Sequence, residues 1–180
     1  EVIEAGPGVT EFKPGDRVMC SGSAGFAEKA VADAGRTYPV PAGMSFEQAA
    51  AYPVALQTMH DAIVTNGAFK PGYAVLIQGA SSGVGIAGMQ IAKALGARLV
   101  IGTSTNADRR AKLKEYGADL ALDSRDPNWV TETVKATGEG VDIIVDMISG
   151  YVANQNLEAT RVLGRIVSIG RLGGMSGNFE

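Results

Sequence analysis

Apolar and polar positions follow two different patterns along this chain of 180 residues. From residue 70 onward, short apolar runs alternate with longer segments whose apolar positions recur every three or four residues. This alternation is typical of a parallel sheet with helices on both faces. The continuous apolar run at 141–146 indicates a strand that is buried on both faces. The pattern predicts strands at 74–78, 98–102, 119–122, 141–146 and 165–169, with helices between them.

Helix boundaries in this region are predicted from their capping residues. Thr105 or Asn106 is expected to cap one helix, and Pro127 suits the first position of the next. A helix over about 152–163 is expected to lead into the last strand.

The first part of the chain consists of short strand-like runs broken by turns. Strands are predicted at 17–20 and 26–31. Ser45 and Gln48 form a capping-box pattern, which opens a helix. The chain is therefore expected to divide at about residue 68, into a mostly β part with connecting helices at 1–67 and an α/β part at 68–180.

A glycine-rich turn connects the strand at 74–78 to the following helix. Its sequence is Gly79-Ala80-Ser81-Ser82-Gly83-Val84-Gly85. Glycine lets the backbone approach a pyrophosphate closely, and the free N–H groups and positive end of the helix stabilise the anion. The turn is not a literal GxGxxG motif, but its place at the start of the strand–helix alternation makes it a strong indication of dinucleotide binding.

The end of the second α/β strand indicates which nicotinamide cofactor is used. An NAD site places Asp or Glu there, on the ribose 2′-hydroxyl. Here the stretch 102–106 has hydroxyl and amide side chains and no carboxylate before Asp108, and Arg109 and Arg110 follow. A guanidinium bonds a 2′-phosphate well. We expect NADPH, although both arginines also fit an ordinary solvated helix face.

Composition and charge exclude several classes of protein. A net charge of −3 and a pI of about 5.2 argue against nucleic acid or an anionic membrane as the main partner. No apolar stretch reaches the roughly 18 residues of a membrane span, so a cytoplasmic protein is expected. The single cysteine, Cys20, and the single histidine, His60, exclude an internal disulfide and a multi-histidine metal site. Cys20 is expected in the core.

Five segments in order resemble the medium-chain dehydrogenase/reductases, in their zinc-free quinone oxidoreductase (zeta-crystallin-like) branch. The resemblance covers essentially the whole chain. It rests on KPGDRV at 13–18, GFAE at 25–28, PAGMSFEQAA at 41–50, KPG at 70–72 and AKALGA at 92–97.

The resemblance implies a Rossmann domain preceded by part of a mostly β, GroES-like catalytic domain. It also implies reduction of a quinone or activated enone with NADPH and without zinc, and a homodimer for the full-length protein. Compared with the family, segments before Glu1 and after Glu180 are expected to be missing, the sixth Rossmann strand among them. No catalytic residue is assigned, because the family's candidates lie mostly before Glu1.

Cofactor-binding positions follow from the resemblance and from the strand ends. Gly83 and Val84 match the backbone at the pyrophosphate, Thr58 matches a threonine near the nicotinamide, and Arg109 falls where the family usually has a phosphate-binding lysine. The other expected positions are Ser82, Ser104, Thr105, Ser124, Met147, Ile169 and Gly170.

Two residues depart from the family pattern near this site. Ser124 stands where the family commonly has a tyrosine over the adenosine phosphate, and the loop 146–150 differs from the family's D-x-V-G. Asp146, at the end of its strand, is expected to orient that loop.

Four other interpretations remain open. The glycine turn also fits the GxxxGxG of short-chain dehydrogenases, but those enzymes need Tyr-x-x-x-Lys, and no tyrosine here has a lysine four residues on. A catalytic zinc needs three protein ligands, for which Cys20 and His60 are the soft candidates here. A nucleotide-binding module without turnover, or an enoyl-reductase domain of a larger synthase, would carry the same motifs.

Overall fold

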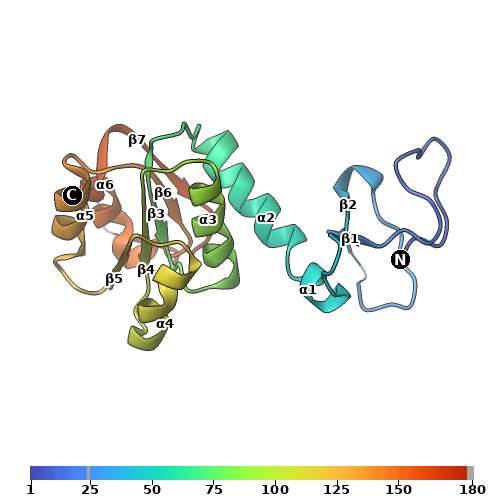
Figure 1. Ribbon diagram of the computed structural model, residues 1–180. Coiled ribbons are helices and arrows are strands. Elements are labelled where there is room, and N and C mark those ends of the chain that lie inside the picture. Colours follow the sequence, from blue (N-terminus) through green and yellow to red (C-terminus); the bar gives the residue numbers. More distant parts are fainter. Residues whose placement is uncertain (24, 178–180) are drawn as a thin grey trace. The chain divides into compact units, whose positions relative to one another are not determined.

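The computed structural model describes residues 1–23 and 25–177 (Figure 1). They form two compact units, which divide between Ala55 and Leu56. Helix α2, Pro53–His60, begins in the first unit and ends in the second. Within the described residues, no helix is both long and apolar enough to cross a membrane.

The first unit contains a two-stranded antiparallel ladder and one short helix. Strand β1, Val18–Cys20, pairs with β2, Thr37–Pro39, and a single 3-10 turn, Ala34–Arg36, precedes β2. Helix α1, Phe46–Ala50, has the expected capping box. In it, the Gln48 N–H donates to Ser45 Oγ at 3.2 Å, and the Ser45 N–H donates to Gln48 Oε1 at 3.0 Å.

Two predictions for this unit are wrong. Residues 26–31 are bends and irregular chain, because Phe26 and Val31 lie fully exposed and the segment pairs with no other described strand. Cys20 is exposed rather than part of a core.

The second unit is a five-stranded parallel sheet in the order β5-β4-β3-β6-β7. The order reverses between β3 and β6, as in Rossmann folds. Residues 74–77 of β3 and 143–145 of β6 are fully buried, as their apolar runs predict. The strands are β3 Ala74–Gln78, β4 Leu99–Thr103, β5 Leu120–Leu122, β6 Val141–Asp146 and β7 Thr160–Ser168.

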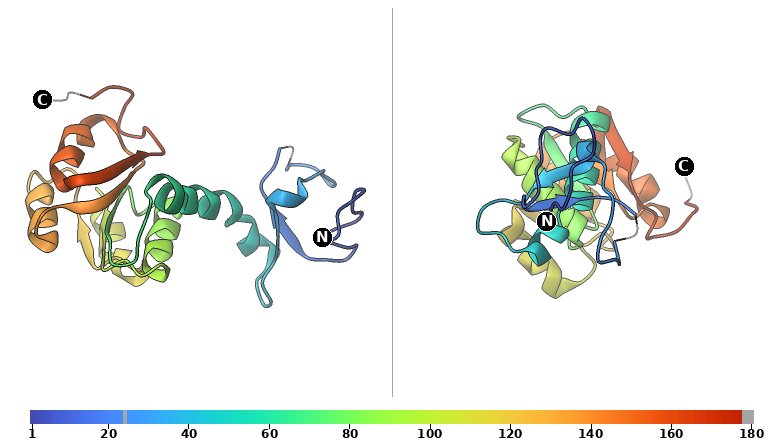
Figure 2. Two further views of the ribbon diagram at one scale, coloured as in Figure 1. Left: turned by 90° about the horizontal axis from the view of Figure 1, so that it is seen from above. Right: turned by 90° about the vertical axis from the view of Figure 1, so that its right-hand side faces the viewer.

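Helices cover both faces of this sheet, each over its own apolar core (Figures 1 and 2). On one face, Met59, Ile63 and Met89 pack against β3 and β6. On the other face, Trp129 packs against Leu76 and Ile144. The helices are α3 Gly83–Ala94, α4 Ala107–Lys112, α5 Trp129–Thr137 and α6 Ala153–Ala159, with a π-helix at Asp61–Asn66 and 3-10 turns at Leu113–Tyr116 and Gly150–Val152.

Asp142 connects the amino ends of three strands. Its Oδ2 accepts the Ala74 N–H at 2.7 Å, and its Oδ1 accepts Arg161 Nε at 2.6 Å. The hydrogen bond to this carboxylate raises the pKa of Arg161 above its ordinary value. These bonds fix the amino ends of β3, β6 and β7 to one another, at the edge of the sheet opposite their carboxyl ends.

Two helix boundaries differ from the predictions. Pro127 lies in a turn before α5, because the Trp129 N–H donates to Asp126 O at 3.2 Å and the helix begins only at Trp129. Helix α6 ends at Ala159 rather than near residue 163, because Thr160 already pairs with Val141 in the sheet.

Candidate functional site

A groove of about 310 Å³ lies at the carboxyl ends of β3, β4, β5 and β6. This is the edge where open α/β sheets bind ligands, and it includes the point where the strand order reverses. No described residue that lines the groove is an Asp or a Glu. The lining residues are Gly79, Ser81, Ser82, Thr103, Ser104, Thr105, Asn106, Arg109, Ser124, Arg125, Ile148, Tyr151, Leu172 and Gly173.

The glycine turn forms the base of the groove and opens α3. Gly79 has φ +74°, and a Cβ there would lie 3.0 Å from Ile148 Cδ1. Ser82 caps the helix, since its Oγ accepts the Gly85 N–H at 3.1 Å. The N–H groups of Gly83 and Val84 have no acceptor among the described residues, as is usual for a first helical turn. This end of α3 therefore suits an anion.

The wall at the end of β4 carries hydroxyl groups and one free cation. Ser104 Oγ donates to Ser81 Oγ at 3.0 Å, which joins this wall to the glycine turn. Asn106 caps α4 by accepting the Arg109 N–H at 2.9 Å. Arg109 lines the groove, and its guanidinium has no hydrogen-bond or ion-pair partner in the described chain.

The two neighbouring arginines have different surroundings. Arg110 Nη1 donates to Ser104 O at 2.7 Å and to Asp123 Oδ2 at 2.9 Å. Arg110 thus connects the ends of β4 and β5 and is not available for a ligand. Arg109 is the one of the pair that remains free to bind an anion.

The wall beyond β5 contains a tyrosine from a distant segment. Ser124 is buried, and its Oγ lies 3.3 Å from the hydroxyl of Tyr151, which follows β6. Arg125 also lines this side, with an exposed side chain. The groove therefore has a second arginine and, next to Ser124, the aromatic ring of Tyr151, although Ser124 itself stands where the family commonly has a tyrosine.

The structure brings five of the expected site residues together in the groove: Ser82, Ser104, Thr105, Arg109 and Ser124. Gly83 and Val84 lie next to them at the start of α3. Met147 lies just beneath, 6% exposed, with its Sδ 3.6 Å from Ser82 Oγ. Thr58, Ile169 and Gly170 do not line the groove.

The loop after β6 forms the remaining side. Asp146 Oδ1 accepts the N–H groups of Ile148 at 2.8 Å and Ser149 at 2.9 Å, which confirms the expected role of Asp146 in orienting the loop. Leu172 and Gly173 lie alongside this loop, since their N–H groups donate to the carbonyls of Met147 and Ile148.

Several groove residues were not singled out from the sequence. Tyr151, Arg125, Ile148, Leu172 and Gly173 come from loops after different strands. The sequence could have indicated them only by their positions after predicted strands, because residues just beyond the carboxyl ends of parallel strands meet at one edge of the sheet. Nothing in the local sequence places Tyr151 beside Ser124.

As to metals, no three His, Cys, Asp or Glu side chains in the described ranges are grouped to hold an ion.

The fold and the groove define a Rossmann-type α/β architecture with a candidate dinucleotide site at its switch point. Residues 83–179 match the family described as zinc-binding dehydrogenase. The chain belongs to this family, within the medium-chain dehydrogenase/reductase superfamily.

Similar proteins agree with this assignment. Human quinone oxidoreductase is 35% identical over 176 residues, which are 96% of this chain and 53% of that protein. The human synaptic vesicle membrane protein VAT-1 homolog is 32% identical over 94% of this chain and 43% of its own length. The chain thus spans about half the length of the curated relatives it matches.

Solved structures show the same fold. A quinone oxidoreductase from Pseudomonas syringae superposes with a TM-score of 0.81 at 29% identity, over 96% of this chain and 54% of that one. A mycobacterial protein complexed with NADPH gives a TM-score of 0.85 at 29% identity, over 99% of this chain and 56% of that one.

Proposed function

We propose that this chain is the cofactor-binding part of an NADPH-dependent reductase that acts on quinones or activated enones without zinc. The observation that carries the proposal is the charge of the groove. Two arginines and several hydroxyl groups line it, and no acidic side chain among the described residues does. An NAD site needs a carboxylate at the ribose 2′-hydroxyl, whereas a 2′-phosphate needs cations and hydrogen-bond donors.

The residues present fit NADPH at both of its charged groups. The free N–H groups of Gly83 and Val84, at the positive end of α3, would hold the pyrophosphate. A Cβ at Gly83 would meet nothing within 4 Å, so the backbone there is open to a ligand. Arg109, Ser104 and Thr105 would hold the 2′-phosphate, because Arg109 has no competing acid.

When bound, the cofactor supplies the hydride. The described residues would bind and orient it: the glycine turn fixes the pyrophosphate, and the loop after β6 closes one side of the groove. Such a reaction requires positioning more than acid–base side chains. A small polarised carbonyl compound is the substrate class that this chemistry suits. The similarity to quinone oxidoreductases supports the same substrate class.

Parallel titrations with NADPH and NADH test the proposal. Cofactor fluorescence and thermal stability are followed for the unchanged chain, for Arg109→Ala, and for the control Arg98→Ala. Arg98 is an exposed arginine at the amino end of β4, outside the groove. Loss of one charged contact, on the order of 1.5–3 kcal/mol, lowers affinity about tenfold or more.

We expect the unchanged chain and Arg98→Ala to prefer NADPH, and Arg109→Ala to lose that preference. Equal binding of NADH by the unchanged chain would contradict the 2′-phosphate assignment. Binding of neither cofactor would contradict the proposed function for this chain. Turnover of a simple quinone by the whole protein then separates a reductase from a binding module without turnover.

A further inference from the structure

A row of polar side chains crosses the carboxyl end of the sheet, on the face that α5 and α6 cover. Gln78 pairs in register with Asp146, and Asp146 with Ser168. Thr103 lies one position beyond Gly102, the register partner of Ile77. Three of the four are almost completely buried: Gln78 and Thr103 at 0% exposure and Asp146 at 3%. Buried polar groups are costly unless they are hydrogen-bonded, so their partners are informative.

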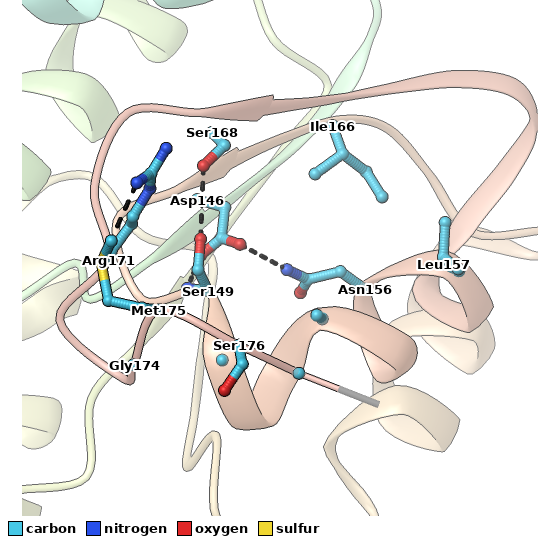
Figure 3. A pocket seen from close by; sticks show the side chains of 13 residues that line it. Asp146, Ser149, Asn156, Leu157, Ile166, Ser168, Arg171, Gly174, Met175 and Ser176 are labelled. Carbon is cyan, nitrogen blue, oxygen red and sulfur yellow. Dashed lines mark hydrogen bonds between the residues drawn. The ribbon is translucent and has the colours of Figure 1, made fainter. Parts of the chain in front are cut away.

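The buried members form one continuous chain of hydrogen bonds, which passes through Asn156 of α6. Thr103 Oγ1 donates to Gln78 Oε1 at 2.7 Å, and Gln78 Nε2 donates to Asn156 Oδ1 at 2.8 Å. Asn156 Nδ2 then donates to Asp146 Oδ2 at 3.0 Å (Figure 3). Each residue of this chain donates to the next, and the last hydrogen bond is accepted by the carboxylate of Asp146.

The two ends of the chain hold the two sides of the groove. At one end, the Gly79 N–H donates to Thr103 Oγ1 at 3.1 Å, which fixes the glycine turn. At the other end, Asp146 Oδ1 holds the N–H groups of Ile148 and Ser149. Gly79 and Ile148 both line the groove and lie in close contact, since a Cβ on Gly79 would be 3.0 Å from Ile148 Cδ1.

Asn156 itself lies outside the cofactor groove. It lines a second cavity, of about 380 Å³, together with Ser149, Ser168 and Arg171 (Figure 3). Within the described residues, the hydrogen bonds of the Asn156 side chain connect it to the groove through this chain. A fully connected polar network of this kind rigidifies the groups at its ends.

We propose that Gln78 and Asn156 are positioning residues, which fix the glycine turn against the loop after β6 and so set the width of the cofactor groove. The expected effect on NADPH binding rests on the proposed function. The hydrogen-bonded link between α6 and the glycine turn stands on geometry alone. The two parts are therefore tested by separate measurements on the whole 180-residue chain.

The test variant is Asn156→Leu, which keeps the size of the side chain but cannot donate or accept. Asn156→Ala is the milder second variant, because the adjoining cavity of about 380 Å³ is large enough for water to replace the amide. The control is Ile144→Ala, a truncation of a fully buried residue in the core on the same face of the sheet, outside the hydrogen-bond chain. The measurements are the dissociation constant for NADPH and amide hydrogen exchange by NMR.

We expect Asn156→Leu to raise the dissociation constant at least fivefold, and Asn156→Ala to raise it by a smaller factor. Ile144→Ala should change it by less than twofold, despite its loss of thermal stability. In the Asn156 variants, amide exchange should accelerate at Gly79 as well as at Ile148 and Ser149. In the control, these three amides should not accelerate more than the other amides of the chain.

Equal effects of Asn156→Leu and Ile144→Ala on NADPH affinity would overturn the positioning role, because a merely structural loss would then explain both. Faster exchange at Ile148 and Ser149 with unchanged exchange at Gly79 would also overturn it. If the unchanged chain binds no NADPH, the proposed function fails. The exchange at Gly79 then decides the positioning link by itself: acceleration supports it, and no change refutes it.

Discussion

Two glycines of the same turn serve different purposes, and one substitution at each separates them. Gly85 lies where α3 crosses the start of the turn, and a Cβ there would lie 2.6 Å from Ala80 Cα, 2.7 Å from its O and 2.8 Å from its C. A Cβ added at Gly83, two positions earlier, would meet no atom within 4 Å. We therefore predict that Gly85→Ala destabilises the protein and that Gly83→Ala does not.

The magnitude follows from the atoms that would collide. Carbon atoms in contact prefer about 3.5–4.0 Å, so α3 would have to move away from the sheet by about 1 Å. The Ala80 backbone cannot yield easily, because its N–H donates to Thr103 O at 2.8 Å. Overpacking costs about 1–3 kcal/mol, and rigid backbone places this case near the top of the range. Alanine recovers up to about 1 kcal/mol of helix propensity, which leaves a net loss of about 2 kcal/mol.

Urea unfolding measures this loss directly. The chain has a single tryptophan, Trp129, which is buried in the second unit and reports its unfolding by fluorescence. Gly83→Ala should be unchanged in stability or up to about 1 kcal/mol more stable. It should nevertheless lower NADPH affinity about tenfold, because the methyl group occupies space that the pyrophosphate needs. Equal stabilities of the two variants would refute the assignment of Gly85 to packing and Gly83 to the ligand.

Two further predictions concern buried polar groups and backbone strain. Thr103→Val should lower the free energy of unfolding by about 2–4 kcal/mol, since it leaves the Gly79 N–H and Gln78 Oε1 without partners. The control Thr133→Val, equally buried, should cost less than about 1 kcal/mol, because its hydroxyl bonds only a helical carbonyl; similar losses in urea unfolding would contradict the network. Ser149 has φ +54° and ψ −151°, a conformation that favours glycine. Ser149→Gly should therefore be about 1–3 kcal/mol more stable than Ser149→Ala in thermal unfolding, and the opposite order would show that the backbone there is not strained.

The central strands and several caps could be predicted because their signals are local. Residues 74–78 and 141–146 are apolar enough to be recognised as strands, the second as one buried on both faces, and the structure has them within the same bounds. Ser45 and Asn106 cap α1 and α4, as predicted, because a side-chain oxygen at the N-cap accepts an N–H group of the first turn of the helix that follows it.

The failed predictions concern segments whose structure depends on distant partners. Residues 26–31 have the composition of a strand, but no described strand lies beside them. Thr160 follows a helical pattern, yet pairing with Val141 extends β7 back to that residue. Sheet pairing brings residues together across many positions of sequence, so local propensity alone does not decide it.

The sequence by itself determined that a glycine turn opens a helix after a buried strand, and that the end of the next strand carries arginine and hydroxyls instead of a carboxylate. The tertiary structure decided which of these groups remain available. Asp123 engages Arg110 and leaves Arg109 free, and Tyr151 reaches Ser124 from another loop. The reason is geometric: a parallel sheet gathers the carboxyl ends of strands that are far apart in the chain, and only that arrangement pairs some polar groups and leaves others open to a ligand.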